Sequence, residues 1–225
     1  MQKQKRDKAT TKDNPWLYRF EPLKEEMMEI KMEIKQRQLE IIEAAGKLLT
    51  TSGVSGLTIK NLAIEMNFSE SAIYRHFTSK EKIILTLLQY LHENVDRIMN
   101  NRPIAGDFKK EFYSLFKRLT GYFKENPYYV VAVFSEGLLD ESDQISEKII
   151  QLMDTLTKHV QFLIEDGQKM QLITDLLTSE QIAQIIIPAF RHQMFKWKIS
   201  DFESDIEHDI ESLLRSLLEL LKIRE

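Results

Sequence analysis

The chain has 225 residues, of which 43% are apolar, enough for a packed core in one large domain or two small ones. It has no cysteine, which excludes disulfides and thiolate metal sites, and it has no signal peptide and no apolar run near about 18 residues, so we expect a cytoplasmic protein without membrane contact. The formal net charge of −4 is unpromising for a nucleic-acid-binding protein unless its positive charge is concentrated in one region.

The composition favours helices. Only 7 Gly and 5 Pro interrupt a chain rich in Leu, Ile, Glu, Lys and Gln, which predicts an all-α fold of about nine helices plus an N-terminal extension. We divide the chain into the extension (residues 1–34) and two domains (residues 35–82 and 83–225). Lys and Arg outnumber Asp and Glu by 7 to 5 in the first domain, whereas acidic residues dominate the second by 23 to 16.

The extension has three parts. Residues 1–15 are polar, basic and aperiodic, which indicates a disordered arm, either a solvated tail without a role or an arm that contacts phosphate. Trp16–Phe20 is too apolar for a free tail, and we expect its rings to dock on the protein. Apolar residues then recur every three or four positions from Leu23 to Ile34, which predicts an amphipathic helix leading into the next domain.

Residues 57–82 have the capping and turn residues of a helix-turn-helix. Thr58 suits the N-cap of a short helix, Asn67 tolerates the left-handed conformation of a tight turn, and Ser69 caps a second short helix. The positions expected to face inward are Leu62, Ala63, Met66, Ile73 and Phe77. Thr78–Glu81 has the form of a T-x-x-E capping box, so a third helix begins beside the second and offers free N–H groups to a phosphate.

The second short helix carries a polar outward face. Its hydroxyl, guanidinium and imidazole groups suit contacts with phosphates and base edges, and Lys60 precedes them on the first helix. The outward or lateral residues are Ser71, Ala72, Tyr74, Arg75 and His76. We therefore interpret this helix as the recognition helix of a domain that binds double-stranded DNA. The alternative is a purely structural motif, because capped helix pairs occur in many all-α domains.

The run from Gln38 to Leu85 resembles the N-terminal domain of TetR/AcrR-type transcriptional repressors. The similarity lies in the segments IIEAAGKLLTTSG, LTIKNLA and SESAIYRHFTSKEKIIL, and it covers roughly a fifth of the chain. It implies phosphate contacts from Thr58, Lys60, Tyr74, His76 and Lys80, and base-edge contacts from Glu70, Ser71, Ala72 and Arg75. One departure is Asn67–Phe68, where the family usually has Gly and a smaller aliphatic residue. Asn also accepts positive φ, so the turn is expected to survive.

Six further helices follow. The apolar spacing predicts them over residues 80–100, 108–123, 127–139, 142–165, 178–197 and 200–221. The first is long enough to link two domains, and the third, which starts at Pro127, is apolar nearly all round and is expected to be central. Gly167 is expected to stop the fourth, and capping boxes at Thr178–Gln181 and Ser200–Glu203 to open the last two.

Aromatic residues gather in the middle region, where they either line an apolar ligand pocket or form the core. The tyrosines favour a pocket, since their hydroxyls can orient a mostly apolar ligand. We predict a cavity for an apolar or amphipathic small-molecule effector. Its lining residues are Phe112, Phe116, Tyr122, Tyr128, Phe134, His159 and Phe162, with Arg118 and His192 as further candidates for holding an anionic end.

The last two helices have apolar stripes wider than one small domain easily buries. A symmetry mate would cover them in a four-helix bundle, the arrangement that the family resemblance also implies. The residues predicted at this homodimer interface are Phe190, Met194, Trp197, Leu213, Leu217 and Leu221.

Motifs for other chemistries are not found in the sequence. The five His residues stand on different predicted helices without the spacing of a metal site, and there is no G-x-S-x-G, P-loop or G-x-G-x-x-G motif. We expect no metal, no cofactor and no enzymatic activity. The sequence predicts a homodimeric, ligand-released repressor on a palindromic operator. The alternatives are a helical protein-interaction module with a structural helix-turn-helix, or a DNA-binding protein of this family without a small-molecule effector.

Overall fold

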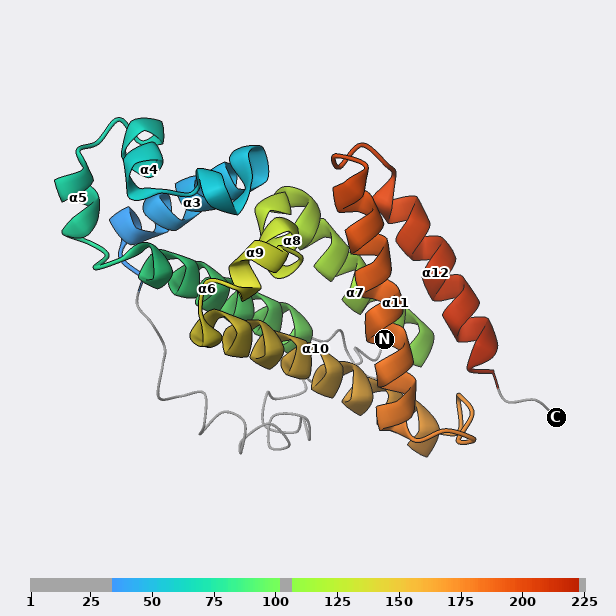
Figure 1. Ribbon diagram of the computed structural model, residues 1–225. Helices are drawn as coiled ribbons and strands as arrows, with labels where there is room; N and C mark the ends of the chain where they lie inside the picture. The colour runs from blue at the N-terminus through green and yellow to red at the C-terminus, as the bar shows by residue number, and fades with distance from the viewer. Residues whose placement is uncertain (1–33, 102–106, 223–225) are drawn as a thin grey trace, which may run out of the picture. The chain divides into compact units, whose positions relative to one another are not determined.

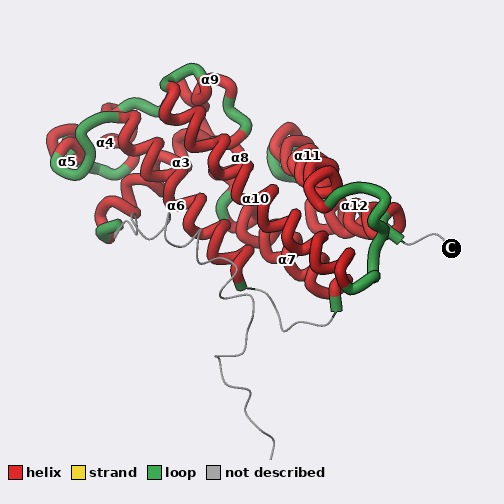
Figure 2. Tube along the Cα trace, turned by 90° about the horizontal axis from the view of Figure 1, so that it is seen from below, coloured by secondary structure: helices red, strands yellow, loops and turns green. Residues whose placement is uncertain are grey.

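The computed structural model describes residues 34–101 and 107–222, and within these ranges every regular element is an α-helix (Figure 1, Figure 2). The all-α prediction is confirmed. The helices are α3 (Gln36–Gly56), α4 (Ile59–Glu65), α5 (Glu70–Tyr74), α6 (Lys80–Asn100), α7 (Phe108–Glu125), α8 (Pro127–Val133), α9 (Glu136–Leu139), α10 (Asp143–Lys169), α11 (Ser179–Ile199) and α12 (Ile206–Leu220). None of these described helices is long and apolar enough to cross a membrane.

The sequence predictions for residues 1–33 lie outside the described residues. They comprise the basic arm, the aromatic segment Trp16–Phe20 and nearly all of the helix predicted from Leu23 to Ile34. Residues 37–225 form one compact unit.

Two predicted helix boundaries are wrong. The helix expected over residues 127–139 is two helices, α8 and α9, separated at Phe134 and Ser135. Gly167 does not stop α10, which continues to Lys169. A Cβ at Gly167 would lie 2.8 Å from the Phe108 ring, so this glycine permits close packing inside a helix.

The predicted caps have mixed outcomes. The capping box at Thr178–Gln181 is present and opens α11. At the start of α6 the N-cap is Ser79 instead of Thr78, and its hydroxyl accepts a hydrogen bond from the N–H of Lys82. The box predicted at Ser200–Glu203 is wrong, because α11 continues to Ile199 and two residues of that stretch then take positive φ. Asp205 caps α12 instead.

Helix α10 forms the middle of the body, the name we use for α6 to α12. It packs along α6 on one side and α11 on the other, while α12 packs on α7 and α11 (Figure 1). Three polar side-chain pairs join α6, or its N-terminal end, to the α10 segment: Lys80 with Glu141 at 2.5 Å, His92 with Thr155 at 2.8 Å, and Asp96 with His159 at 2.8 Å. Both partners advance along the chain together, so α6 and α10 run parallel.

We define the head as α3, α4 and α5. It joins the body at the start of α6, and α3 also contacts α8 and α9. A Cβ at Gly46 of α3 would overlap the ring of Tyr128 on α8, so this ring packs directly on the backbone of α3. Near the end of α3, the Val54 side chain lies 3.5 Å from where a Cβ on Gly137 of α9 would be. Hence α8 and α9 both contact α3 of the head.

Substitution of Gly46 with Ala tests the closeness of the first contact. Because the added methyl group meets the Tyr128 ring, G46A is expected to destabilise the protein by about 1–3 kcal/mol in urea unfolding despite the better helix propensity of Ala. Gly121→Ala on α7 is the matched control, since no atom lies within 4 Å of its Cβ position. That variant is expected to gain up to about 1 kcal/mol. Equal stability of both variants would contradict the contact.

Candidate nucleic-acid interface

Backbone hydrogen bonds and caps define the helix-turn-helix. Asn67 has φ of 55°, as predicted, and the N–H of Phe68 donates to the carbonyl of Ala63 at 2.8 Å, the bond that closes a helix end of this kind. The hydroxyl of Thr58 accepts from the N–H of Asn61 at 3.1 Å and caps α4. The hydroxyl of Ser69 accepts from the N–H of Ala72 at 3.2 Å and caps α5. Both predicted caps are confirmed.

The inward face of the motif is also as predicted. Leu62, Ala63, Ile73 and Phe77 are buried, and Met66 is half-buried. Polar contacts then fix α4, and the residues that follow α5, on α3. These contacts are Lys47 with Glu65, Asn61 Nδ2 with the carbonyl of Gly56 at 2.8 Å, and Gln38 Nε2 with the carbonyl of His76 at 3.4 Å.

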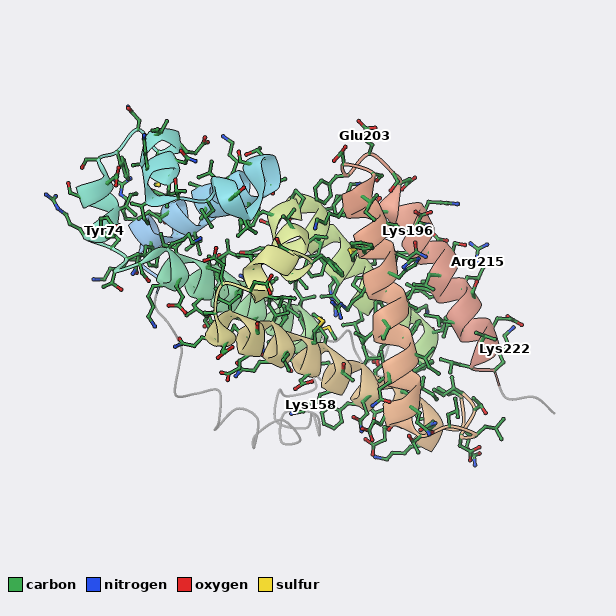
Figure 3. The ribbon with its side chains drawn as sticks, in the orientation of Figure 1. Tyr74, Lys158, Lys196, Glu203, Arg215 and Lys222 are labelled. Carbon is green, nitrogen blue, oxygen red and sulfur yellow. The ribbon has the colours of Figure 1, made fainter. Side chains whose placement is uncertain are left out.

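The predicted DNA-contacting side chains share one end of the unit, on or beside α4, α5 and the start of α6 (Figure 3). Thr58, Lys60, Glu70, Ser71, Tyr74, Arg75 and His76 are exposed, and Ala72 and Lys80 are half-buried. Tyr74 is 51% exposed, so about half of this large side chain is open to solvent. Such a surface offers hydroxyl, imidazole and cationic groups to phosphates and base edges, while Glu70 can accept from a cytosine amino group.

Lys80 has a partner that sequence reasoning missed. Its ammonium lies 2.5 Å from Glu141, in the connection between α9 and α10. The two residues are 61 positions apart, so no local pattern links them. The cation expected at the DNA is thus paired with a carboxylate of the body.

Residues 41–87, which contain this helix-turn-helix, match the family model described as bacterial regulatory proteins, tetR family. This segment is therefore a DNA-binding domain of the TetR family. The chain is a DNA-binding transcriptional regulator, and the matched range ends inside α6, where the TetR-family head joins the body.

Known proteins resemble this chain over most of its length. The nucleoid occlusion factor SlmA of Pectobacterium carotovorum is 27% identical over 158 residues, 66% of this chain and 79% of that protein. Among solved structures, the fatty acid degradation regulator FadR of Bacillus halodurans has a TM-score of 0.71 at 17% identity, covering 84% of this chain and 96% of its own. FadR of Bacillus subtilis, solved in complex with stearoyl-CoA, has a TM-score of 0.68 at 18% identity, covering 83% and 97%. The likeness to these structures concerns the fold.

The predicted pocket residues fall into separate groups in the body. Phe112 and Phe116 are fully buried, and Phe116 also contacts Phe190 of α11, with ring centroids 5.2 Å apart. His159 instead pairs with Asp96 on α6, with 2.8 Å between its Nε2 and the carboxylate. Phe162 is half-buried on α10.

Three tyrosines form a second group behind Gly46. Tyr129, fully buried, stacks on Tyr122 at 5.6 Å and contacts Tyr128 at 4.4 Å. Burial raises the pKa of all three phenols, so they are neutral at physiological pH. The Tyr122 hydroxyl is buried without a hydrogen bond of normal geometry within the described residues. The side chains of Tyr129 and Asn94 are its polar neighbours.

Phe134 belongs to a third place, a groove of about 320 Å³ on α11. Its other lining residues are Pro188, Arg191, His192 and Phe195. The guanidinium of Arg191 lies 5.1 Å above the Phe134 ring, and burial lowers its pKa. Arg191 and Phe195 were not predicted from the sequence, although Pro188, Arg191 and Phe195 recur at helical spacing.

The residues predicted at the dimer interface are mostly buried inside one chain. Phe190, Met194, Trp197, Leu217 and Leu221 are buried, and Leu213 is half-buried. Their stripes close the packing among α7, α10, α11 and α12, so these side chains leave little surface for a second copy. The apolar residues that α11 leaves exposed are Ile185, Pro188, Phe195 and Ile199.

Lys60 and Arg75 test how the head meets DNA. Lys60→Ala is expected to weaken binding to every duplex and to reduce the slope of log affinity against log salt by about one, because it loses one phosphate contact. Arg75→Ala is expected to lose about 1–3 kcal/mol on the preferred site and to change sequence preference. The control is Lys158→Ala, an exposed lysine on α10 far from Tyr74 in Figure 3. Fluorescence anisotropy with labelled duplexes measures the affinity of each of the three variants. If all three bound DNA as tightly as the wild-type protein, this orientation of the head on DNA would be wrong.

Proposed function

We propose that the chain is a repressor that binds a palindromic operator as a homodimer and leaves it when an apolar or amphipathic small molecule binds in the body. Residues 35–82 form the DNA-binding domain and residues 83–225 the effector and dimerisation domain. The observation that carries the proposal is the continuity of α6. This helix begins beside the recognition helix and continues without a break to Asn100 in the body. A change in the body can therefore alter the position of the head.

The dimer is formed by the outer face of α11. Ile185, Phe195 and Ile199 are 52%, 39% and 64% exposed, and with Pro188 they make one apolar stripe along the helix. A second copy related by a two-fold axis covers both stripes at once, because the contact is the same surface on each partner. Two heads on one axis then meet the two halves of a palindrome.

Phe195→Glu tests the dimer. A charge in the middle of the stripe is expected to give monomers in analytical ultracentrifugation at micromolar concentration and to abolish tight operator binding, while the fold persists because Phe195 is exposed. Leu176→Glu is the control, since Leu176 is 85% exposed in the connection between α10 and α11. A dimeric F195E, or a monomeric wild-type protein, would refute the interface.

The effector is an amphipathic molecule with a long apolar part. Support comes from the aromatic residues of the body and from the stearoyl-CoA complex of the Bacillus subtilis FadR, a structural neighbour. The pocket is lined by members of the predicted set, with the buried Tyr122 hydroxyl as a polar contact. The tyrosine group touches Gly46 through Tyr128, which gives a bound molecule a direct route to α3.

Stearoyl-CoA, with stearate and CoA as separate probes, tests this assignment. At about one hundred times its dissociation constant, an effector is expected to raise the melting temperature by about 5–10 °C and to release operator DNA. Tyr122→Phe is expected to reduce the shift with little loss of stability, because its hydroxyl makes no hydrogen bond of normal geometry to the described residues. Tyr113→Phe, on the same helix, is the control.

The second candidate is a DNA-binding regulator without a small-molecule effector. Complete burial of Phe112 and Phe116 against ring partners favours it, since a filled core leaves no space for a ligand there. Absence of any thermal shift across a broad library of apolar and amphipathic molecules would support this candidate over the first.

A further inference from the structure

The pairing of Lys80 with Glu141 joins a candidate phosphate contact to the body. Lys80 is the first residue of α6, next to the recognition helix, and its ammonium lies 2.5 Å from the Glu141 carboxylate. The two side chains are only 29% and 30% exposed, so the pair is partly shielded from solvent. Partial burial makes such a pair stronger and less screened by salt than a free surface pair.

Glu141 is held in place by the segment that carries it. Leu138 is fully buried, Gly137 lies against Val54 of α3, and Ser142 caps α10 directly after Glu141. The carboxylate is thus fixed to the N-terminal end of α10, the helix that packs along α6. The pairs of His92 with Thr155 and Asp96 with His159 hold the same two helices further along.

We propose that Glu141 competes with operator phosphate for Lys80, so that this residue of the body sets the affinity of the head for DNA. The inference rests on the proposed function, in which the start of α6 contacts phosphate. One ammonium cannot give its full charge to two anions, and a carboxylate fixed beside it repels a phosphate that approaches. When α10 keeps its place on α6 the competitor is present, and a shift of α10 along α6 moves it away from Lys80.

Glu141→Gln tests the competition in the full-length protein. The probe is a labelled duplex selected by the wild-type protein from random DNA, with binding followed by fluorescence anisotropy over a series of salt concentrations. E141Q is expected to bind several times more tightly and to show a steeper salt slope by about one, because Lys80 becomes available to a phosphate. Asp140→Asn, an exposed neighbour with the same change of charge, is the control and is expected to change affinity less than about twofold.

A double-mutant cycle with Lys80→Gln assigns the effect to the pair. In the Lys80→Gln background the tightening caused by Glu141→Gln is expected to shrink to the part that comes from repulsion between the carboxylate and phosphate. Weaker or unchanged binding by E141Q, while Lys80→Gln alone weakens binding, would overturn the inference and leave the proposed function standing. If Lys80→Gln binds as the wild type does, Lys80 contacts no phosphate and the inference also fails. If the wild-type protein selects no duplex, the proposed function itself fails.

Discussion

The contact between the Tyr128 ring and the bare backbone of Gly46 fixes where the DNA-binding head stands on the body. Any side chain at position 46 would push α3 from α8. Tyr128 is held in turn by Tyr129, and its hydroxyl donates to Asn126 at 3.0 Å. Because Asn126 ends α7 and begins α8, the position of the head is linked to the junction of two body helices.

The parallel pair of α6 and α10 adds a second link between head and body. Its polar contacts differ in character along the helices. At the head end the contact is an ion pair, whereas His92 and Thr155 share a hydrogen bond in a partly buried place. Burial, and then the nearby charge of Lys148, lowers the pKa of His92, so this contact is neutral at physiological pH. Of these two contacts, the one between two charged side chains therefore lies closer to the DNA-binding surface.

The helix-turn-helix was predictable because its signals are local. A cap, a residue that accepts positive φ and apolar positions four apart all lie within a few residues of the structure they specify, as Thr58, Asn67 and Ile73 illustrate. An apolar stripe, by contrast, shows that a helix face is buried but not what covers it. For this reason Phe190 and Trp197 were assigned to a second copy although they pack inside one chain. The pairing of Lys80 with Glu141 depends on the tertiary fold, and the sequence carries no sign of it.

The proposed release of DNA requires the two heads of a dimer to move when the body binds its effector. The distance between the heads tests it most directly, and the chain has no cysteine, so a spin label on Thr51→Cys, exposed near the end of α3, is unique. Pulsed electron paramagnetic resonance on the labelled dimer then gives this distance with and without stearoyl-CoA. We expect one main distance in the free protein and a clearly different one with effector. An unchanged distance under conditions where stearoyl-CoA binds and releases DNA would contradict it.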